Sequence, residues 1–274
     1  MIDRYSLLAD RPGALSIHAR CRLGAALLMI SGLPLAQAGG LGLLSPTPLS
    51  LAASTSKSPT IARFADFAEA QASPDARHIA DWIADSRNNA GLDFLIVDKK
   101  SAHLYVFDSD ARLRGSTPVL LGTARGDDSA PGIGTRPLAE VLLEERTTPA
   151  GRFMGERGRN LRDEDVVWVD YDAAVSMHRV LMTNPEERRL QRLATPTASD
   201  NRISYGCINV PVAFYERAVR PTFATRRALV YVLPEVRSLE AVFGSYDVAK
   251  MHSLLSTRAH AESLGAAADR GTSD

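Results

Sequence analysis

The sequence has no excess of either charge and almost no cysteine. Its 32 basic residues are balanced by 32 acidic ones, so the formal net charge is zero. A balanced charge gives no electrostatic reason to expect nucleic acid or an anionic membrane as a partner. Only two cysteines occur, at positions 21 and 207, and no His/Cys cluster has the spacing of a metal site. We therefore expect no nucleic-acid partner, no metal and no cofactor.

One glycine-rich segment, residues 122–138, superficially suggests a dinucleotide site. It contains Gly132-Ile133-Gly134, but it does not open a helix in a βαβ unit. The dinucleotide fingerprint needs that context, because the helix N-terminus binds the pyrophosphate. We interpret residues 122–138 as a long loop.

The N-terminal 38 residues have the features of a secretory signal peptide. Four arginines precede an apolar run over residues 23–36, and the small-x-small sequence AQA follows at 36–38. Cleavage after Ala38 would remove Cys21 and leave Cys207 as the only cysteine of the mature protein.

The alternative is an uncleaved anchor, because apolar residues resume at 41–44. Pro34 and the nearby glycines interrupt a spanning helix of about 20 residues, which favours cleavage. Both interpretations place the rest of the chain outside the cytoplasm, in the periplasm or at the cell wall, after export through the inner membrane. No lipobox cysteine follows the exit, which argues against a lipoprotein.

Composition divides the chain into five parts. The segment after the signal peptide is rich in Ser, Thr, Pro and Gly and is typical of a tether. The last 18 residues, rich in Ala, Ser and Gly, predict a disordered tail. The parts are a signal peptide (1–38), a flexible tether (39–58), a helical N-terminal extension (59–91), a main domain (92–234) and a C-terminal extension (235–274).

Two helices are predicted in the N-terminal extension. Ser58-Pro59 and Ser73-Pro74 each place a capping serine before a proline at the first helical position. The first helix would carry an apolar stripe of Ile61, Phe64 and Phe67, and the second one of Ile79, Trp82 and Ile83. We expect both helices only to pack on the main domain.

The main domain is predicted to be mainly β with short helices. Apolar and β-branched runs separated by turn residues at 98–101 and 108–110 indicate an antiparallel meander at its start. The predicted strands cover 92–97, 102–107, 113–121, 138–145, 166–170, 174–181 and 227–233, and the predicted helices cover 184–193 and 212–219.

The segment Ser204-Tyr-Gly-Cys207-Ile-Asn209 is the strongest candidate for chemistry. A lone thiol in an oxidising compartment has no partner for a disulfide and is a candidate reactive group. Gly206 lets the backbone approach a substrate closely, and a helix that begins near Pro211 would favour a thiolate. The alternative is a buried structural cysteine, a common fate of free thiols.

A nucleophilic cysteine needs a base, because its free pKa of about 8.5 leaves little thiolate at neutral pH. His103 and His178 are the histidines of the main domain. His178 lies near the end of a strand that precedes the cysteine segment, where a rigid element can present its ring. Its alternative role is that of a strand residue bonded to backbone.

Three successive segments resemble the signatures of the L,D-transpeptidase (YkuD-type) catalytic domain. They are TPAGRF at 148–153, the strand end Met177-His178, and SYGCIN at 204–209. The meander at 92–122 is also similar to the first strands of that domain. The resemblance covers residues 92–233 and implies a β-sandwich or barrel with short helices.

The resemblance implies Cys207 as nucleophile and His178 as general base. The thiolate would attack the carbonyl at the L-centre of a diamino acid in a peptidoglycan stem peptide. An amine from another stem, or from an envelope protein, would then resolve the thioester; water instead would make the enzyme an L,D-carboxypeptidase. Backbone N–H groups at Gly206 and Cys207 would stabilise the oxyanion, with Ser204, Tyr205 and Asn209 supporting the loop.

Three features depart from the family pattern. Tyr205 stands where a second histidine is frequent, and Arg179 stands where glycine commonly follows the base. The separation of 29 positions between His178 and Cys207 is longer than usual, because of the Arg-rich segment 184–203. We consider Arg179, Arg188, Arg189 and Arg192 as contacts to substrate carboxylates, with a solvated charged face as the alternative for the last three.

Two other functions remain possible from the sequence. Arg179 and Tyr205 suggest a degenerate domain that binds the cell wall without chemistry. An unrelated secreted cysteine peptidase would also need a Cys–His pair, but nothing else in the chain supports it.

Overall fold

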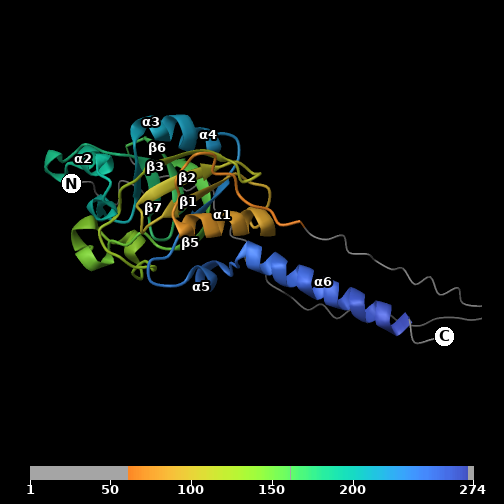
Figure 1. Cartoon of the computed structure of the whole chain (residues 1–274). Coiled ribbons are helices and arrows are strands. Elements are labelled where there is room, and N and C mark those ends of the chain that lie inside the picture. The colour runs from red at the N-terminus through yellow and green to blue at the C-terminus, as the bar shows by residue number, and fades with distance from the viewer. Residues whose placement is uncertain (1–60, 161, 271–274) are drawn as a thin grey trace, which may run out of the picture. The chain divides into compact units, whose positions relative to one another are not determined.

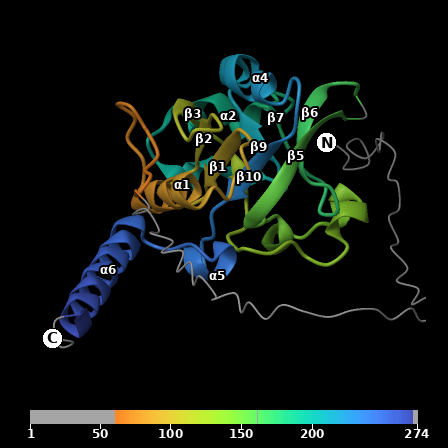
Figure 2. The ribbon, with the colours of Figure 1, turned by 90° about the vertical axis from the view of Figure 1, so that its right-hand side faces the viewer.

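The computed structural model describes residues 61–160 and 162–270. The predicted signal peptide (1–38), the predicted tether (39–58) and residues 271–274 lie outside the described residues. The described part is built on a mixed eight-stranded sheet with the strand order β3-β2-β1-β10-β5-β6-β7-β9 (Figures 1 and 2). The strands are β1 (Phe94–Asp98), β2 (His103–Phe107), β3 (Leu113–Pro118), β5 (Gly151–Arg159), β6 (Asp165–Asp170), β7 (Val175–Arg179), β9 (Ile208–Val210) and β10 (Ala228–Val232).

The two ends of this sheet approach one another. Just after β3, the backbone N–H of Leu120 donates to the carbonyl of Asn209 at 2.9 Å, and the N–H of Asn209 donates to the carbonyl of Leu120 at 2.8 Å. A parallel pair, β4 (Leu121–Gly122) with β8 (Arg202–Ser204), lies beside this junction. The sheet is therefore nearly closed, and the prediction of a mainly β fold with short helices is confirmed.

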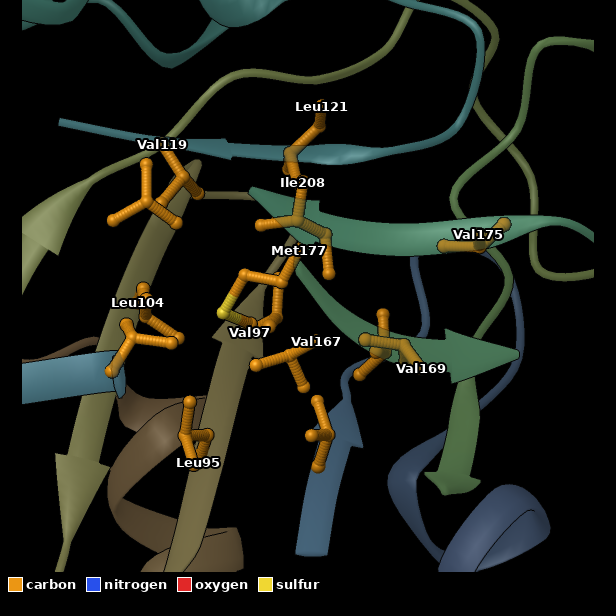
Figure 3. Close-up of a cluster of buried hydrophobic side chains, with 14 of the residues drawn as sticks. Leu95, Val97, Leu104, Val119, Leu121, Val167, Val169, Val175, Met177 and Ile208 are labelled. Atoms are coloured by element: carbon orange, nitrogen blue, oxygen red, sulfur yellow. The ribbon is translucent and has the colours of Figure 1, made fainter. Parts of the chain in front are cut away.

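The interior of the nearly closed sheet holds the main hydrophobic core. Figure 3 shows Met177 of β7 among side chains from β1, β2, β6 and β9, including Val97, Leu104, Val167 and Ile208. These residues occupy alternate positions of their strands, as the two-residue period of a strand requires. The other positions of β1, β2 and β10 are also buried, because a helix covers them.

Helix α1 (Pro74–Ser86) covers the outer face of β1, β2 and β10 (Figure 1). The Ser73 hydroxyl accepts from the N–H of Ala76, and Pro74 occupies the first helical position, as predicted. Ile79 and Ile83 are fully buried against a layer that includes Phe94, Ile96, Tyr105, Phe107 and Tyr231. The prediction that this helix packs on the main domain is confirmed.

The first predicted helix of the N-terminal extension is wrong for residues 61–72, which are not helical. Asp66 instead forms a bridge with Arg112, and its carbonyl accepts from the N–H of Leu113 at 2.8 Å. Two carboxylates of α1, Asp81 and Asp85, accept from backbone N–H groups at residues 65 and 63. These tertiary hydrogen bonds outweigh the weak local helix preference.

Two further elements differ from the prediction. Residues 138–145 form two short 3-10 helices, Leu138–Glu140 and Leu143–Glu145, in place of a strand. Helix α6 (Val248–Arg270) includes most of the predicted disordered tail. Its sequence is rich in Ala and also contains three Leu residues, and the high helix propensity of both residue types explains the difference. A shorter helix, α5 (Leu239–Phe243), precedes it.

The predicted helices within the main domain are present but broken. Residues 184–194 form a 3-10 turn, Pro185–Glu187, and then helix α2 (Arg189–Ala194), with Arg188 between them in the left-handed conformation. Residues 212–222 begin as α3 (Val212–Phe214), continue through a π-helical turn, Tyr215–Val219, and end as α4 (Arg220–Thr222).

A buried polar cluster ties the β1–β2 turn to the long loop and to the segment after β10. The Lys99 ammonium, whose side chain is 0% exposed, donates to Asp127 at 3.1 Å and to the carbonyl of Thr148 at 3.0 Å. Burial lowers the pKa of Lys99. Burial also opposes ionisation of Asp127, yet hydrogen bonds from the N–H groups of residues 235–237 and from Lys99 hold the pKa of its carboxyl well below the usual range.

We predict that Asp127→Asn destabilises the protein by about 3 kcal/mol, because it removes the nearer carboxylate of the buried Lys99 and leaves only Glu235, at 3.8 Å, as its charged partner. The matched control is Asp128→Asn, since the Asp128 side chain is 80% exposed and its pairing with Arg237 is screened by water. Asp128→Asn should change the free energy of unfolding by less than about 0.5 kcal/mol. Urea unfolding measures both values, and equal values for the two variants would contradict the prediction.

Candidate active site

Cys207 lies in the short connection between β8 and β9, on the outer face of the sheet. Its thiol packs with Val166 and Trp168 of β6, while the next residue, Ile208, enters the main core on the opposite face. Cys207 is 8% exposed and is the free cysteine of the described residues. The thiol is therefore held in a largely apolar environment, which by itself disfavours the thiolate.

His178 is brought beside this thiol by the parallel pairing of β7 with β9. In that register Met177 is opposite Ile208 and His178 is opposite Asn209. The His178 Nδ1–H donates to the carbonyl of Arg179 at 2.7 Å, because a carbonyl can only accept. This bond fixes the tautomer and leaves Nε2 as the basic nitrogen.

The environment of Cys207 favours ionisation despite burial. Burial raises the pKa of the thiol, but a hydrogen bond with His178 and the charge of that imidazole lower it, as do hydrogen bonds from Ser176. Together these effects lower the pKa of Cys207 to about 7. A substantial thiolate fraction is therefore present at neutral pH, as a nucleophilic cysteine requires.

Ser176 is a site residue that the sequence reasoning missed. Its hydroxyl lies 3.7 Å from the Cys207 sulfur, and the residue is fully buried. The carbonyl of Ala174 lies 3.8 Å from the same sulfur. The two-residue period of a strand could have identified it, because Ser176 is two residues before His178 and must share its face of the sheet.

The cysteine loop is held by hydrogen bonds from its own side chains. The Ser204 hydroxyl donates to the carbonyl of Cys207 at 2.6 Å and accepts from the N–H of Gly206 at 3.1 Å. The Asn209 amide donates to the same carbonyl at 3.3 Å. Gly206 has a φ of 122°, and a Cβ there would lie 2.7 Å from the carbonyl oxygen of Thr147. Only glycine therefore fits this position without a shift of the backbone.

The TPAGRF segment contacts this loop directly. The Thr148 hydroxyl donates to the carbonyl of Gly206 at 2.8 Å and accepts from the N–H of Gly122 at 2.9 Å. The guanidinium of Arg146 lies 3.8 Å from the centre of the Tyr205 ring. Tyr205 packs on the main core, so it stabilises the loop from the face opposite to Cys207.

Two of the candidate substrate arginines, Arg179 and Arg192, have partners within the protein. Arg179 donates to Glu216 at 2.6 Å and pairs with Asp165 at 3.0 Å, and its guanidinium lies over the Tyr215 ring. Arg192 donates to two carbonyls, those of Glu187 and Asp200. Arg188 is exposed. A substrate contact by these three residues stays a prediction.

A cavity of about 280 Å³ opens beside His178. Val166 belongs both to its wall and to the cluster around the thiol, whereas Cys207 itself does not line it. His178 therefore borders the cavity, and Cys207 is connected to its wall through the cluster that it shares with Val166. Its wall consists of Asp163, Glu164, Asp165, Val166, His178, Arg179 and Leu181.

The other candidate features lie elsewhere. His103 is on β2, and its ring packs against Tyr105 of the layer that α1 covers. Within residues 61–160 and 162–270, no group of three or more His, Cys, Asp or Glu side chains is arranged to hold a metal ion. In the same residues no helix has the length and apolar character needed to span a membrane.

No family model matches the chain, and no curated protein sequence matches it. Several solved structures are similar to it. The Ldtfm–avibactam carbamoyl enzyme is 18% identical with a TM-score of 0.30, covering 52% of this chain and 49% of that one. The catalytic domain of an E. faecium L,D-transpeptidase is 17% identical with a TM-score of 0.29, covering 52% of this chain and 98% of that one.

The helical cell shape determining protein Pgp2 from Campylobacter jejuni is 14% identical with a TM-score of 0.37, covering 58% of this chain and 56% of that one. This chain therefore spans about half the length of the first and third of these proteins. At such identities and TM-scores the likeness adds no argument about the chemistry of the chain, which depends on the site described above.

We predict that alkylation of Cys207 follows a titration with a midpoint near pH 7. His178→Gln removes the imidazole that lowers the pKa of the thiol. The effect of burial then dominates, so the midpoint should move upwards by about one pH unit or more. Ser176→Ala should move it in the same direction by less. The rate of iodoacetamide modification, followed by mass spectrometry between pH 5 and 10, measures these midpoints. A His178→Gln midpoint equal to that of the wild type would exclude the pairing.

Proposed function

We propose that this protein is an extracytoplasmic cysteine acyltransferase, an L,D-transpeptidase that acts on peptidoglycan stem peptides. The observation that carries the proposal is the contact of a low-pKa thiol, Cys207, with an imidazole, His178, whose other nitrogen is held by a backbone carbonyl. A nucleophile, its base and a group that orients the base form the minimal constellation for acyl transfer.

In the proposed first step, the Cys207 thiol gives its proton to Nε2 of His178 and the sulfur attacks an amide carbonyl of the donor stem peptide. The carbonyl becomes an oxyanion, for which we assign the N–H of Cys207 as donor, since that of Gly206 donates to Ser204. The C–N bond then breaks, and the leaving amine, that of the terminal D-alanine, takes the proton from His178. The product is a thioester on Cys207.

In the second step, an amine of the acceptor attacks the thioester carbon. His178 removes a proton from this amine and returns it to the sulfur as the C–S bond breaks. The new amide bond is the crosslink, and the free thiol is regenerated. With water as acceptor, the same sequence releases a carboxylic acid, and the enzyme acts as an L,D-carboxypeptidase.

We predict that a carbapenem acylates Cys207 in a one-to-one adduct, because the thiolate opens the β-lactam ring without a leaving group. Cys207→Ala should give no adduct, and His178→Gln should react about 100-fold more slowly, as expected for loss of a general base. Intact-protein mass spectrometry follows both. Unmodified wild type, under conditions that label a control L,D-transpeptidase, would argue for a domain that binds the wall without chemistry.

We predict that incubation of purified sacculi with the mature protein changes their muropeptide profile. A new crosslinked dimer identifies a stem peptide as acceptor, whereas shortening of tetrapeptides to tripeptides identifies water. A protein acceptor would appear as a muropeptide attached to an envelope protein. Binding to sacculi with no change in the profile, relative to the Cys207→Ala control, would contradict the enzymatic function.

A further inference from the structure

Arg189 is a buried arginine of the Arg-rich segment 184–203. Arg189, at the start of α2, is 8% exposed, in contrast to the exposed Arg188 before it. Its Nε donates to the Glu187 carboxylate at 2.5 Å, which neutralises the charge in place. A buried guanidinium is costly unless its donors are satisfied, so its second partner is informative.

That second partner is in the cysteine segment. The Arg189 Nη1 donates to Oδ1 of Asn209 at 2.5 Å, across 20 positions of sequence. Asn209 is 1% exposed, and its backbone forms the bridge with Leu120 that nearly closes the sheet. Its side chain therefore has little freedom other than rotation of the amide.

Arg189 decides the orientation of that amide. A guanidinium has donors only, so it must face the amide oxygen. The Nδ2 of Asn209 is then directed to the carbonyl of Cys207, to which it donates at 3.3 Å. In the opposite orientation the amide oxygen of Asn209 would face the carbonyl oxygen of Cys207, and two acceptors cannot form a hydrogen bond. The Cys207 carbonyl would then lose the bond from Asn209 and keep the one from Ser204.

We infer that Arg189 is a positioning residue, and that segment 184–203 is a clamp on the nucleophile loop. Through Asn209 it fixes the peptide plane that follows Cys207. Arg192 supports the clamp from within the segment, because it donates to the carbonyls of Glu187 and Asp200. The inference rests on the proposed function for its catalytic consequence, but the clamp itself is a property of the fold.

The test compares Arg189→Met and Arg189→Lys with Gln191→Met, an exposed position on the same helix. Arg189→Met should lower the rate of Cys207 acylation by a carbapenem about 10- to 100-fold at saturating reagent, as expected for a misplaced nucleophile. Arg189→Lys keeps a cationic donor and should recover part of the rate. Gln191→Met should react like the wild type.

A double-mutant cycle separates positioning from a general structural role. If Arg189 acts through Asn209, the double variant Arg189→Met/Asn209→Ala should react no more slowly than Asn209→Ala alone. If instead the rate reductions of the two single variants multiply in the double variant, Arg189 does not act through the Asn209 amide, and the inference is overturned.

Hydrogen exchange of the backbone tests the clamp without any activity. Exchange across residues 204–209 should be faster in Arg189→Met than in the wild type and unchanged in Gln191→Met. The variants are expected to fold, since the Glu187 side chain is 27% exposed and can be hydrated when Arg189 is absent; if Arg189→Met does not fold, Arg189→Lys gives the comparison. Unchanged exchange and rates would overturn the clamp, whereas faster exchange in a protein that no carbapenem labels would preserve the clamp and refute the proposed function.

Discussion

The burial of Met177 determines where the imidazole of His178 points. Side chains of a strand alternate between two faces, so a shift of β7 by one residue would expose Met177 and bury His178 in the main core. The apolar core excludes that register, and pairing with β9 then sets Cys207 on the outer face beside Ser176 and His178. The chemistry of the site thus depends on a packing preference of a residue that takes no part in it.

A second constraint comes from hydrogen bonds between segments that are distant in the chain. Thr148 links the long loop at Gly122 to the cysteine loop at Gly206, and its carbonyl accepts from the buried Lys99. If one of these segments moved away, the group that it bonds through Thr148 would lose a hydrogen-bond partner, which is costly in the interior. Buried polar contacts of this kind favour one arrangement of the loops, whereas the apolar core would tolerate several.

The sequence predicted α1 and the strands of the meander, β6, β7 and β10, because each has a local pattern: a capped start or a run of apolar and β-branched residues. It wrongly predicted a strand at residues 138–145. The pairing of Cys207 with His178 was implied by the family resemblance, since the residues alone left His178 as either a base or a strand residue bonded to backbone. The sequence did not predict the irregular, non-helical path of residues 61–72 or the contact of Ser176 with the thiol. Asp66 forms a β-bridge with Arg112, which is distant in the sequence, and no local pattern reveals such a partner. The relation between Ser176 and Cys207 depends on the β7–β9 register, which joins residues 31 positions apart.

The layer between α1 and the sheet bears on where the independently stable unit begins. Without the helix, Phe94, Tyr105, Phe107 and Tyr231 would form an aromatic wall on the outside of the sheet. A wall of this kind in water promotes self-association. Homologous proteins that lack an equivalent helix would need another cover for these strands, such as a neighbouring domain, or smaller and more polar residues at the same four positions.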